Sequence, residues 1–339
     1  MIALFPGQGS QHVGMAKELY DQFKIAQETF EEASDSIHKN LRKLCFDGPE
    51  SDLILTENTQ PCILTVSIAT LRVAQKEFDF TIDFVAGHSL GEYSALVAAG
   101  AFSLNTAVQL VHERGQSMQS AVPVGEGAMA AILNLERQDI ENLCEKATQK
   151  AIEFRKTRAT ENLSVEAIAE PANFNAPGQI VIAGSKDAIQ EAILLIESNE
   201  FPNARAIPLQ VSAPFHCRLM APTRKHMTKF FAELPSAKKP SGLNCPYLPN
   251  RTARITREPG IVLDLLTEQI DHPVLWEQTM TALLETAQPK FLEFGPGIVL
   301  QGLLKRTARK LKKQAPVLSI NTPDTLNSLE KFINEDAKS

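Results

Sequence analysis

Short apolar runs alternate with longer stretches of helical periodicity along the chain. The helical stretches include Thr59–Glu77 and Thr106–Ser120, in which apolar residues recur at the spacing of one helix face. The strand-like runs are Ile2–Phe5, Asp83–Gly87, Ile180–Ala183, Arg205–Val211 and Phe291–Phe294. Strands and helices that alternate in this way predict an α/β protein whose core sheet is parallel.

A compact insertion interrupts this pattern after the turn-rich segment Ala121–Gly127. Strand-like and helical runs follow it at 128–135, 137–149, 179–185, 186–198 and 204–210. A β-α-β-β-α-β order of this kind suggests a small ferredoxin-like subdomain. We therefore expect an α/β-hydrolase-like parallel-sheet core, formed by residues 1–123 and 210–339, with the small subdomain inserted at 124–209.

The stretch Lys146–Glu170 inside this insertion is polar and charged, and its periodicity is weak. We expect an extended surface helix or loop there. Such a segment either alters the docking of a partner or only decorates the surface, and the sequence leaves both alternatives open.

Composition narrows the class of protein. Apolar residues make up 43% of the chain and charged residues 22%, as in an ordinary soluble enzyme. The formal charge of −6 argues against nucleic-acid binding, which usually needs a basic domain. The longest apolar runs, such as Ala95–Phe102, are too short to span a membrane, and the first residues do not resemble a secretory signal. We expect a cytoplasmic protein and a monomer.

The five cysteines are scattered and form no C-x-x-C pair, which indicates buried free thiols. Cys217 follows His216 directly and is a conceivable nucleophile. Side chains of sequence neighbours seldom point together, however, and a serine lies in a better context.

That serine is Ser89, which lies between Gly87 and Gly91 in a Gly-x-Ser-x-Gly frame. A strand is expected before the frame and a helix after it. An elbow of this kind exposes the serine and points helix N–H groups at its substrate.

A serine hydroxyl needs a base within hydrogen-bonding reach. His216 follows a strand and opens a helical run, and α/β active sites gather at the ends of strands. The other six histidines are interpreted as surface or packing residues; they are His12, His38, His88, His112, His226 and His272.

The sequence leaves the role of three further stretches open when each is taken alone. The loop Phe5–Gln11 has two glycines but lacks the Gly-Lys-Ser/Thr ending of a nucleotide-triphosphate loop. Arg114 lies in a regular helix, where a surface position is common. Residues 292–306 read as a strand, a Gly-Pro-Gly turn and a helix.

Taken together, these stretches resemble a known family. The motifs FPGQGSQ, GHSLGEYSAL, RG before AVP, NFNAPGQIVIAGS, FHC and LEFGPGIVLQGLLKR occur in the order found in malonyl-CoA:acyl carrier protein transacylases. The resemblance runs from residue 2 to about residue 330, interrupted mainly by the stretch Lys146–Glu170.

The resemblance implies a role for each matching position. Ser89 corresponds to the acyl-accepting nucleophile and His216 to its general base. Gln269 corresponds to the residue whose backbone carbonyl orients that histidine in place of a carboxylate. Gln8 and the backbone N–H of Leu90 correspond to the oxyanion hole.

The resemblance also implies the substrates. Arg114 corresponds to the residue that pairs with the malonyl carboxylate, and a planar guanidinium suits that carboxylate. Phe215 and Asn173 fall in the substrate-binding set, where the ring of Phe215 narrows the acyl pocket. The implied reaction moves a malonyl group from malonyl-CoA to the phosphopantetheine thiol of acyl carrier protein for fatty-acid biosynthesis, without a metal or redox cofactor.

The segment 303–313 is basic although the whole chain is acidic. It either steers an acidic carrier protein or is a solvated helix end whose cations complement the helix dipole.

Three alternative functions compete with this reading. A polyketide-type acyltransferase or an acyl hydrolase shares Ser89 and His216, although a hydrolase has no need of Arg114. An α/β-hydrolase esterase needs an acid before the histidine, and many carboxylates lie in that interval. A scaffold that only binds carrier protein would have no use for an intact set of Ser89, His216, Arg114 and Gln8.

Overall fold

The computed structural model describes residues 1–157, 164–211 and 213–334. The chain divides into two compact units. The first consists of Met1–Gln116, Glu233–Leu263 and Thr279–Ser339, and the second of Ser117–Ala232 and Asp264–Gln278. The second unit thus contains the range 124–209 of the expected subdomain and further residues on both sides of it.

The first unit is built on a parallel sheet, as the alternation of strands and helices predicts. Its strand order is β2-β1-β7-β8, and each neighbouring pair is parallel. The strands are β1 (Ile2–Phe5), β2 (Phe84–Gly87), β7 (Phe291–Phe294) and β8 (Val317–Ile320). All residues of β1 and β7 are buried, which explains the unbroken apolar sequence of β1. The one polar residue of β7, Glu293, accepts the backbone N–H groups of Leu300 and Gln301 with its carboxylate.

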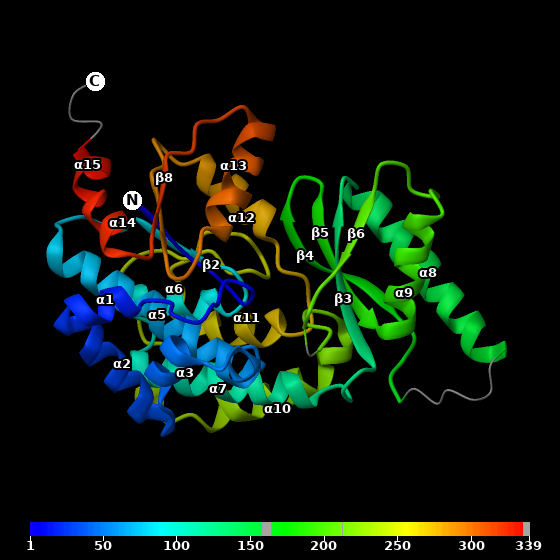
Figure 1. Cartoon of the computed structure of the whole chain (residues 1–339), viewed down its shortest axis with the longest axis horizontal. Coiled ribbons are helices and arrows are strands. Elements are labelled where there is room, and N and C mark those ends of the chain that lie inside the picture. Colours follow the sequence, from blue (N-terminus) through cyan, green and yellow to red (C-terminus); the bar gives the residue numbers. More distant parts are fainter. Residues whose placement is uncertain (158–163, 212, 335–339) are drawn as a thin grey trace. The chain divides into compact units, whose positions relative to one another are not determined.

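Helices surround this sheet (Figure 1). The longest is α5 (Thr56–Glu77), which is buried along most of its length. The others in this unit are α1 (Lys17–Gln22), α2 (Lys24–Ile37), α3 (Leu41–Asp47), α4 (Glu50–Leu53), α6 (Gly91–Ala98), α13 (Val299–Leu311), α14 (Pro323–Asn327) and α15 (Leu329–Asn334). Among the helices of the described residues, none combines the length and the apolar character that crossing a bilayer requires.

Four helices contain the points at which the chain passes from one unit to the other: α7 (Leu104–Ser120), α10 (Ala221–Glu233) at its last residue, α11 (Val262–Gln269) and α12 (Trp276–Leu284). The helix α10 thus belongs to the second unit almost entirely. Short 3₁₀ turns occur at Arg218–Met220, Ser236–Lys238 and Pro259–Ile261.

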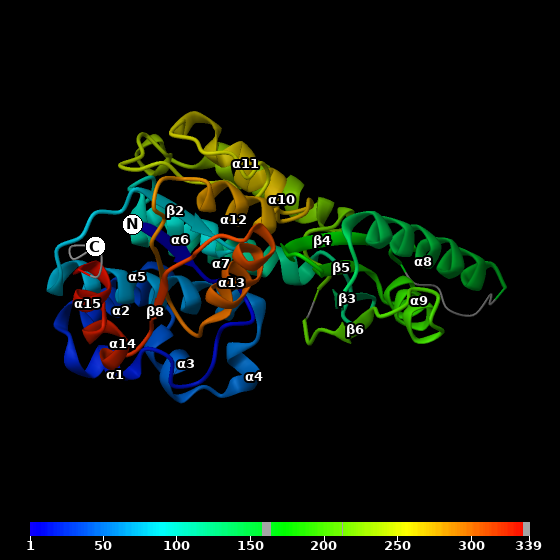
Figure 2. The same cartoon turned by 90° about the horizontal axis from the view of Figure 1, so that it is seen from above.

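The second unit contains an antiparallel sheet of order β4-β5-β3-β6. Its strands are β3 (Gly127–Leu133), β4 (Ala169–Ala176), β5 (Gln179–Ser185) and β6 (Arg205–Pro208). The helices α8 (Arg137–Thr157) and α9 (Lys186–Glu197) run along this sheet (Figures 1 and 2). Residues such as Leu143, Ile182 and Leu195 form the common core of helices and sheet.

The stretch Lys146–Glu170 has three parts. The helix α8 continues to Thr157, beyond the helical run 137–149 that the sequence indicated. Residues 158–163 lie outside the described residues. Strand β4 then begins at Ala169, so the end of the stretch is part of the sheet rather than a loop.

Candidate active site

Ser89 lies at a sharp elbow between β2 and α6. Its backbone has a φ of +52°, which is uncommon for a residue other than glycine. Leu90 follows with helical angles as the N-cap residue of α6, so the helix N-terminus is next to the serine. The structure therefore contains the strand–elbow–helix arrangement that the Gly-x-Ser-x-Gly frame predicts, with Ser89 half-buried.

Close packing explains why the frame needs glycine. A Cβ atom on Gly87 would lie 1.8 Å from the carbonyl oxygen of Gly91. A Cβ atom on Gly91 would lie 2.2 Å from the carbonyl oxygen of Phe5. Neither position accommodates a side chain without moving the backbone. Gly87 therefore lets the start of α6 pack closely on the end of β2, and Gly91 lets α6 pack closely on the end of β1.

The loop Phe5–Gln11 leaves the carboxyl end of β1 beside this elbow. The register pairs Phe5 with Gly87, so the loop and the elbow emerge at the same edge of the sheet. A Cβ atom on Gly7 would lie 2.4 Å from the carbonyl oxygen of His88, which shows how closely the two segments pack. Gln8, in this loop, donates from Nε2 to Oγ1 of Thr56 at 3.3 Å.

Arg114 lies next to the serine hydroxyl. Its guanidinium donates to Oγ of Ser89 at 3.1 Å and to Oε1 of Gln60 at 2.8 Å, and only 1% of the residue is exposed. Burial lowers the pKa of Arg114, while the neighbouring Tyr93 and Glu92 oppose this shift. The buried position differs from the surface position that a helical arginine suggests when taken alone. Gln60, a partner of Arg114, was not indicated by any sequence motif.

Asn250 also contacts the elbow, and the sequence did not indicate it. Its Oδ1 accepts the backbone N–H of Ser89 at 2.6 Å, and its Nδ2 donates to the carbonyl oxygen of Gly87 at 2.6 Å. The backbone N–H of Asn250 donates to Oε2 of Glu92 at 3.0 Å. Asn250 and Glu92 are both fully buried.

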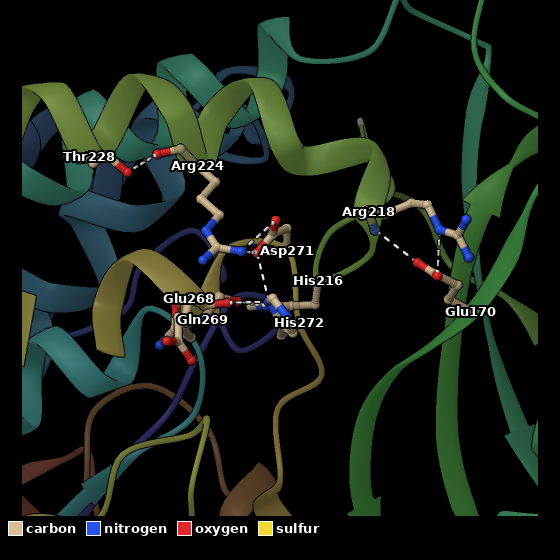
Figure 3. A network of polar contacts seen from close by, with 9 residues as sticks. All are labelled: Glu170, His216, Arg218, Arg224, Thr228, Glu268, Gln269, Asp271 and His272. Carbon is tan, nitrogen blue, oxygen red and sulfur yellow. Dashed lines mark hydrogen bonds and ion pairs between the residues drawn. The ribbon is translucent and has the colours of Figure 1, made fainter. Parts of the chain in front are cut away.

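His216 belongs to the second unit, where a carbonyl oxygen fixes its ring. Nδ1 of His216 lies 2.7 Å from the backbone oxygen of Gln269, and the two residues are 3% and 1% exposed (Figure 3). A carbonyl oxygen only accepts, so Nδ1 carries the proton and Nε2 is left as the basic atom. His216 itself has a φ of +61°.

Ion pairs hold the segments that carry these two residues (Figure 3). Glu170 accepts from the backbone N–H of Arg218 at 2.8 Å and from its Nε at 2.7 Å, just after His216 in the chain. Asp271 lies 3.4 Å from Nη1 of Arg224 and 2.7 Å from Nδ1 of His272, just after Gln269. The carboxylates of Glu170 and Asp271 therefore hold the chain segments next to His216 and Gln269, whereas the imidazole ring of His216 contacts a backbone carbonyl.

Phe215 and Asn173 are both buried in the second unit, at 8% and 6% exposure. Asn173 lies in β4, which forms an isolated parallel bridge to Val274. The neighbouring Phe174 donates its backbone N–H to the carbonyl oxygen of Val274 at 2.9 Å. These contacts around Asn173 are structural, and the assignment of Phe215 and Asn173 to the substrate pocket stays a prediction.

The cysteines have the environment that the sequence indicated, since all five are buried and free. Cys217 donates from Sγ to the carbonyl oxygen of Pro214 at 3.2 Å. Burial raises its pKa to about 12, so the reactive thiolate is scarce at neutral pH. Ser89 is therefore the better nucleophile.

A strained serine at a strand–helix elbow, with a buried arginine beside its hydroxyl, is typical of enzymes that carry acyl groups on serine. A protein-family model described as "Acyl transferase domain" matches residues 3–337. A malonyl CoA-acyl carrier protein transacylase of Bacillus subtilis strain 168 is 40% identical over 333 residues, which are 98% of this chain and 97% of that protein. The chain therefore belongs to the acyl transferase family and, within it, to the malonyl CoA-acyl carrier protein transacylases.

Solved structures agree with this assignment. The malonyl CoA-acyl carrier protein transacylase from Coxiella burnetii superposes with a TM-score of 0.87 at 36% identity, and the match covers 98% of this chain and 97% of that one. A malonyl-transacylase solved in complex with its type II PKS acyl-carrier protein gives a TM-score of 0.86 at 36% identity, with coverage of 97% and 99%.

Proposed function

We propose that this acyltransferase moves a malonyl group from malonyl-CoA to the phosphopantetheine thiol of acyl carrier protein, through a malonyl ester on Ser89. The product supplies extender units for fatty-acid biosynthesis. The observation that carries the proposal is the buried guanidinium of Arg114, 3.1 Å from Oγ of Ser89. If Oγ carries an acyl group that ends in a carboxylate, that carboxylate can pair with the fixed guanidinium of Arg114.

The first half-reaction forms the ester. Oγ of Ser89 attacks the thioester carbon of malonyl-CoA while Nε2 of His216 takes the hydroxyl proton. Gln8 and the backbone N–H of Leu90 stabilise the oxyanion of the tetrahedral intermediate. The intermediate collapses by breaking the carbon–sulfur bond, and the departing CoA sulfur receives the proton from His216.

The second half-reaction runs in reverse with a different thiol. His216 takes the proton of the phosphopantetheine thiol, whose sulfur attacks the malonyl ester. The carbon–oxygen bond to Ser89 then breaks, and the proton returns to Oγ. Both half-reactions need only these side chains, so we propose that no metal or redox cofactor takes part.

Selectivity for malonyl follows from Arg114. An acetyl group would leave the buried guanidinium without its carboxylate, at a cost of about 2–5 kcal/mol. That corresponds to a discrimination of roughly 30-fold to several-thousand-fold. The ring of Phe215 narrows the acyl pocket against branched malonyl groups, and Asn173 completes the substrate-binding set.

The proposed partner is an acyl carrier protein, and the proposed enzyme is a cytoplasmic monomer. The complex of a related malonyl-transacylase with its acyl-carrier protein supports this partner. Lys305, Arg309 and Lys310 are exposed on α13 and offer positive charge to an acidic carrier protein. We expect the KM for the carrier protein to rise with ionic strength.

The detailed fold forms part of this proposal. We assign the first unit to the α/β-hydrolase-like class and the second to the ferredoxin-like class. The element order β3-α8-β4-β5-α9-β6 and the sheet order β4-β5-β3-β6 support the second assignment.

Intact-mass analysis after brief incubation with malonyl-CoA or acetyl-CoA tests the function. We expect a malonyl adduct on the wild type, none on Ser89→Ala, and an acetyl adduct on Arg114→Ala in place of the malonyl one. Free malonate accumulating from the wild type without an adduct would instead show a hydrolase.

A further inference from the structure

We infer that Asn250 is a positioning residue that holds Ser89 in its strained backbone conformation, with Glu92 as its anchor. The inference deepens the proposed function and rests on it, because it concerns the serine that accepts the acyl group.

The outer edge of β2 leads directly to Ser89. β2 is an edge strand of the parallel sheet, and the segment before Asn250 runs beside it. Val85 donates its N–H to the carbonyl oxygen of Pro246 at 3.1 Å and accepts the N–H of Leu248 at 3.2 Å. These bonds have the slanted pattern of a parallel ladder centred on Tyr247.

At Asn250, the side-chain amide makes the hydrogen bonds that the backbone would make if the parallel ladder continued. In the same register, the N–H and C=O of residue 250 would bond to Gly87 and Ser89. The side-chain amide does so instead, since Nδ2 donates to Gly87 and Oδ1 accepts from Ser89, both at 2.6 Å. A primary amide has the donor and acceptor of a peptide group, and here one amide spans both ends of His88.

The backbone of Asn250 is free to turn because its side chain makes these bonds. Its N–H points to Oε2 of Glu92 at 3.0 Å. Glu92 lies in the first turn of α6, where its own N–H donates to the carbonyl oxygen of Ser89 at 3.0 Å. Asn250 and Glu92 therefore connect the strand, the serine and the helix in one buried group of hydrogen bonds.

Ser89 needs such support. A φ of +52° persists in a non-glycine residue only where the surroundings impose it. Gly87 and Gly91 permit the elbow by leaving room, whereas the amide of Asn250 holds it from the side opposite β1. Without this amide the serine backbone relaxes, and Oγ leaves the position from which it attacks.

The substitution Asn250→Asp tests this role with almost no change of shape. A carboxylate oxygen would face the carbonyl oxygen of Gly87 at the same separation, so that contact becomes repulsive. We expect malonylation of Ser89 to slow about 100-fold in single-turnover measurements, as for a reacting group displaced by about 1 Å. The KM for malonyl-CoA should stay unchanged, because no substrate contact is removed.

Asn250→Ser gives a second variant that removes both bonds without burying a charge, and it should slow the reaction similarly. Asn58→Asp is the matched control. Asn58 is also buried in the first unit, and its Nδ2 also donates to a backbone carbonyl, that of Asp52, at 2.9 Å. Thermal unfolding of all three variants separates lost stability from lost positioning.

Labelling of Ser89 by a fluorophosphonate reports the serine position without malonyl-CoA, so it separates this inference from the proposed function. Slow reaction of both Asn250 variants with both reagents, alongside a fast Asn58→Asp control of similar stability, supports the inference. It is overturned if either Asn250 variant reacts at the wild-type rate, or if Asn58→Asp is slowed equally.

Discussion

The two units use different interactions to hold a site residue that has a positive φ. Ser89 in the first unit and His216 in the second both have a positive φ, +52° and +61°. The first is held by glycine packing and by the fully buried Asn250 and Glu92. The chain segments next to His216 and Gln269 are held by ion pairs that are partly exposed to solvent.

The exposure of these ion pairs shows the contrast. The side chains of Arg218 and Glu170 are 57% and 26% exposed, and those of Arg224 and Asp271 are 39% and 9% exposed. Salt screens charges near the surface and has much less effect on hydrogen bonds that are buried away from solvent. The nucleophile should therefore keep its geometry over a wide range of ionic strength, and the base should be the more sensitive of the two.

The largest effect is expected from removing the base itself. His216→Gln should slow malonylation about 100- to 10,000-fold, the usual contribution of a general base. His226→Gln is the control, because His226 is an exposed histidine on α10 of the same unit. Single-turnover release of CoA measures both. Equal rates for the two variants would show that His216 is not the base.

Packing at the elbow is the next test. Gly91→Ala should destabilise the protein by about 1–3 kcal/mol or more, because its Cβ would collide with the backbone of β1. Gly302→Ala in α13 meets nothing within 4 Å and should stabilise by up to about 1 kcal/mol through helix propensity. Urea unfolding of both variants measures the contrast, and a stable Gly91→Ala would refute the packing account.

A partly buried charge pair gives the second unit a pH dependence. Burial alone would raise the pKa of Asp187, but hydrogen bonds from Arg155 and Ser185 bring it below its usual value. Arg155 contacts both oxygens of Asp187, at 2.6 and 2.9 Å. A lowered carboxyl pKa stabilises the fold above the unfolded pKa, and this stability is lost as pH falls through the lower folded value.

Asp187→Asn should therefore lower the unfolding free energy by about 1–2 kcal/mol at neutral pH. The difference from the wild type should shrink as the solution becomes acidic, through the range below about pH 4. Urea titrations across that range give the measurement. A difference that is independent of pH would mean that the ion pair is not its source.

The smallest effect concerns the ion pair beside Gln269. Asp271→Asn removes the partner of Arg224 and should slow malonylation about two- to fivefold at low salt, in line with a partly exposed pair. High salt should bring the wild-type rate towards that of the variant. Asp21→Asn breaks an exposed pair with Lys17 and serves as the unaffected control. A wild-type rate that does not depend on salt would contradict the contrast between the units.

The sequence predicted most reliably those structural features that depend only on residues close together in the chain. The bounds of β1 and β7 were predicted as observed because these strands are buried throughout and therefore apolar, with Glu293 of β7 as the exception. Strands β4 and β8 were missed. β4 contains a proline and two asparagines, and β8 is short and half-buried at its start, so their pairing partners determine them.

In the site, too, local features could be predicted from the sequence and long-range contacts could not. The glycine frame marks Ser89 because the elbow is local, but Asn250 lies 161 residues away and belongs to no motif. Gln269 acts through a backbone oxygen, which every residue has, so only the family resemblance indicated that position. Gln60 also belongs to no motif. Glu92 lies within the motif around Ser89, but its contact with Asn250 became visible only once the chain was folded.

In the proposed reaction, the malonyl group on Ser89 is passed to a thiol and not to water. The direct measurement isolates the malonyl-enzyme and mixes it with acyl carrier protein, either carrying phosphopantetheine or lacking it, while intact masses are recorded over time. We expect the malonyl mass to move to the carrier protein that carries phosphopantetheine, and to stay on the enzyme when the carrier protein lacks it. Loss of the malonyl group at the same rate in both mixtures, with free malonate formed, would contradict the proposed reaction.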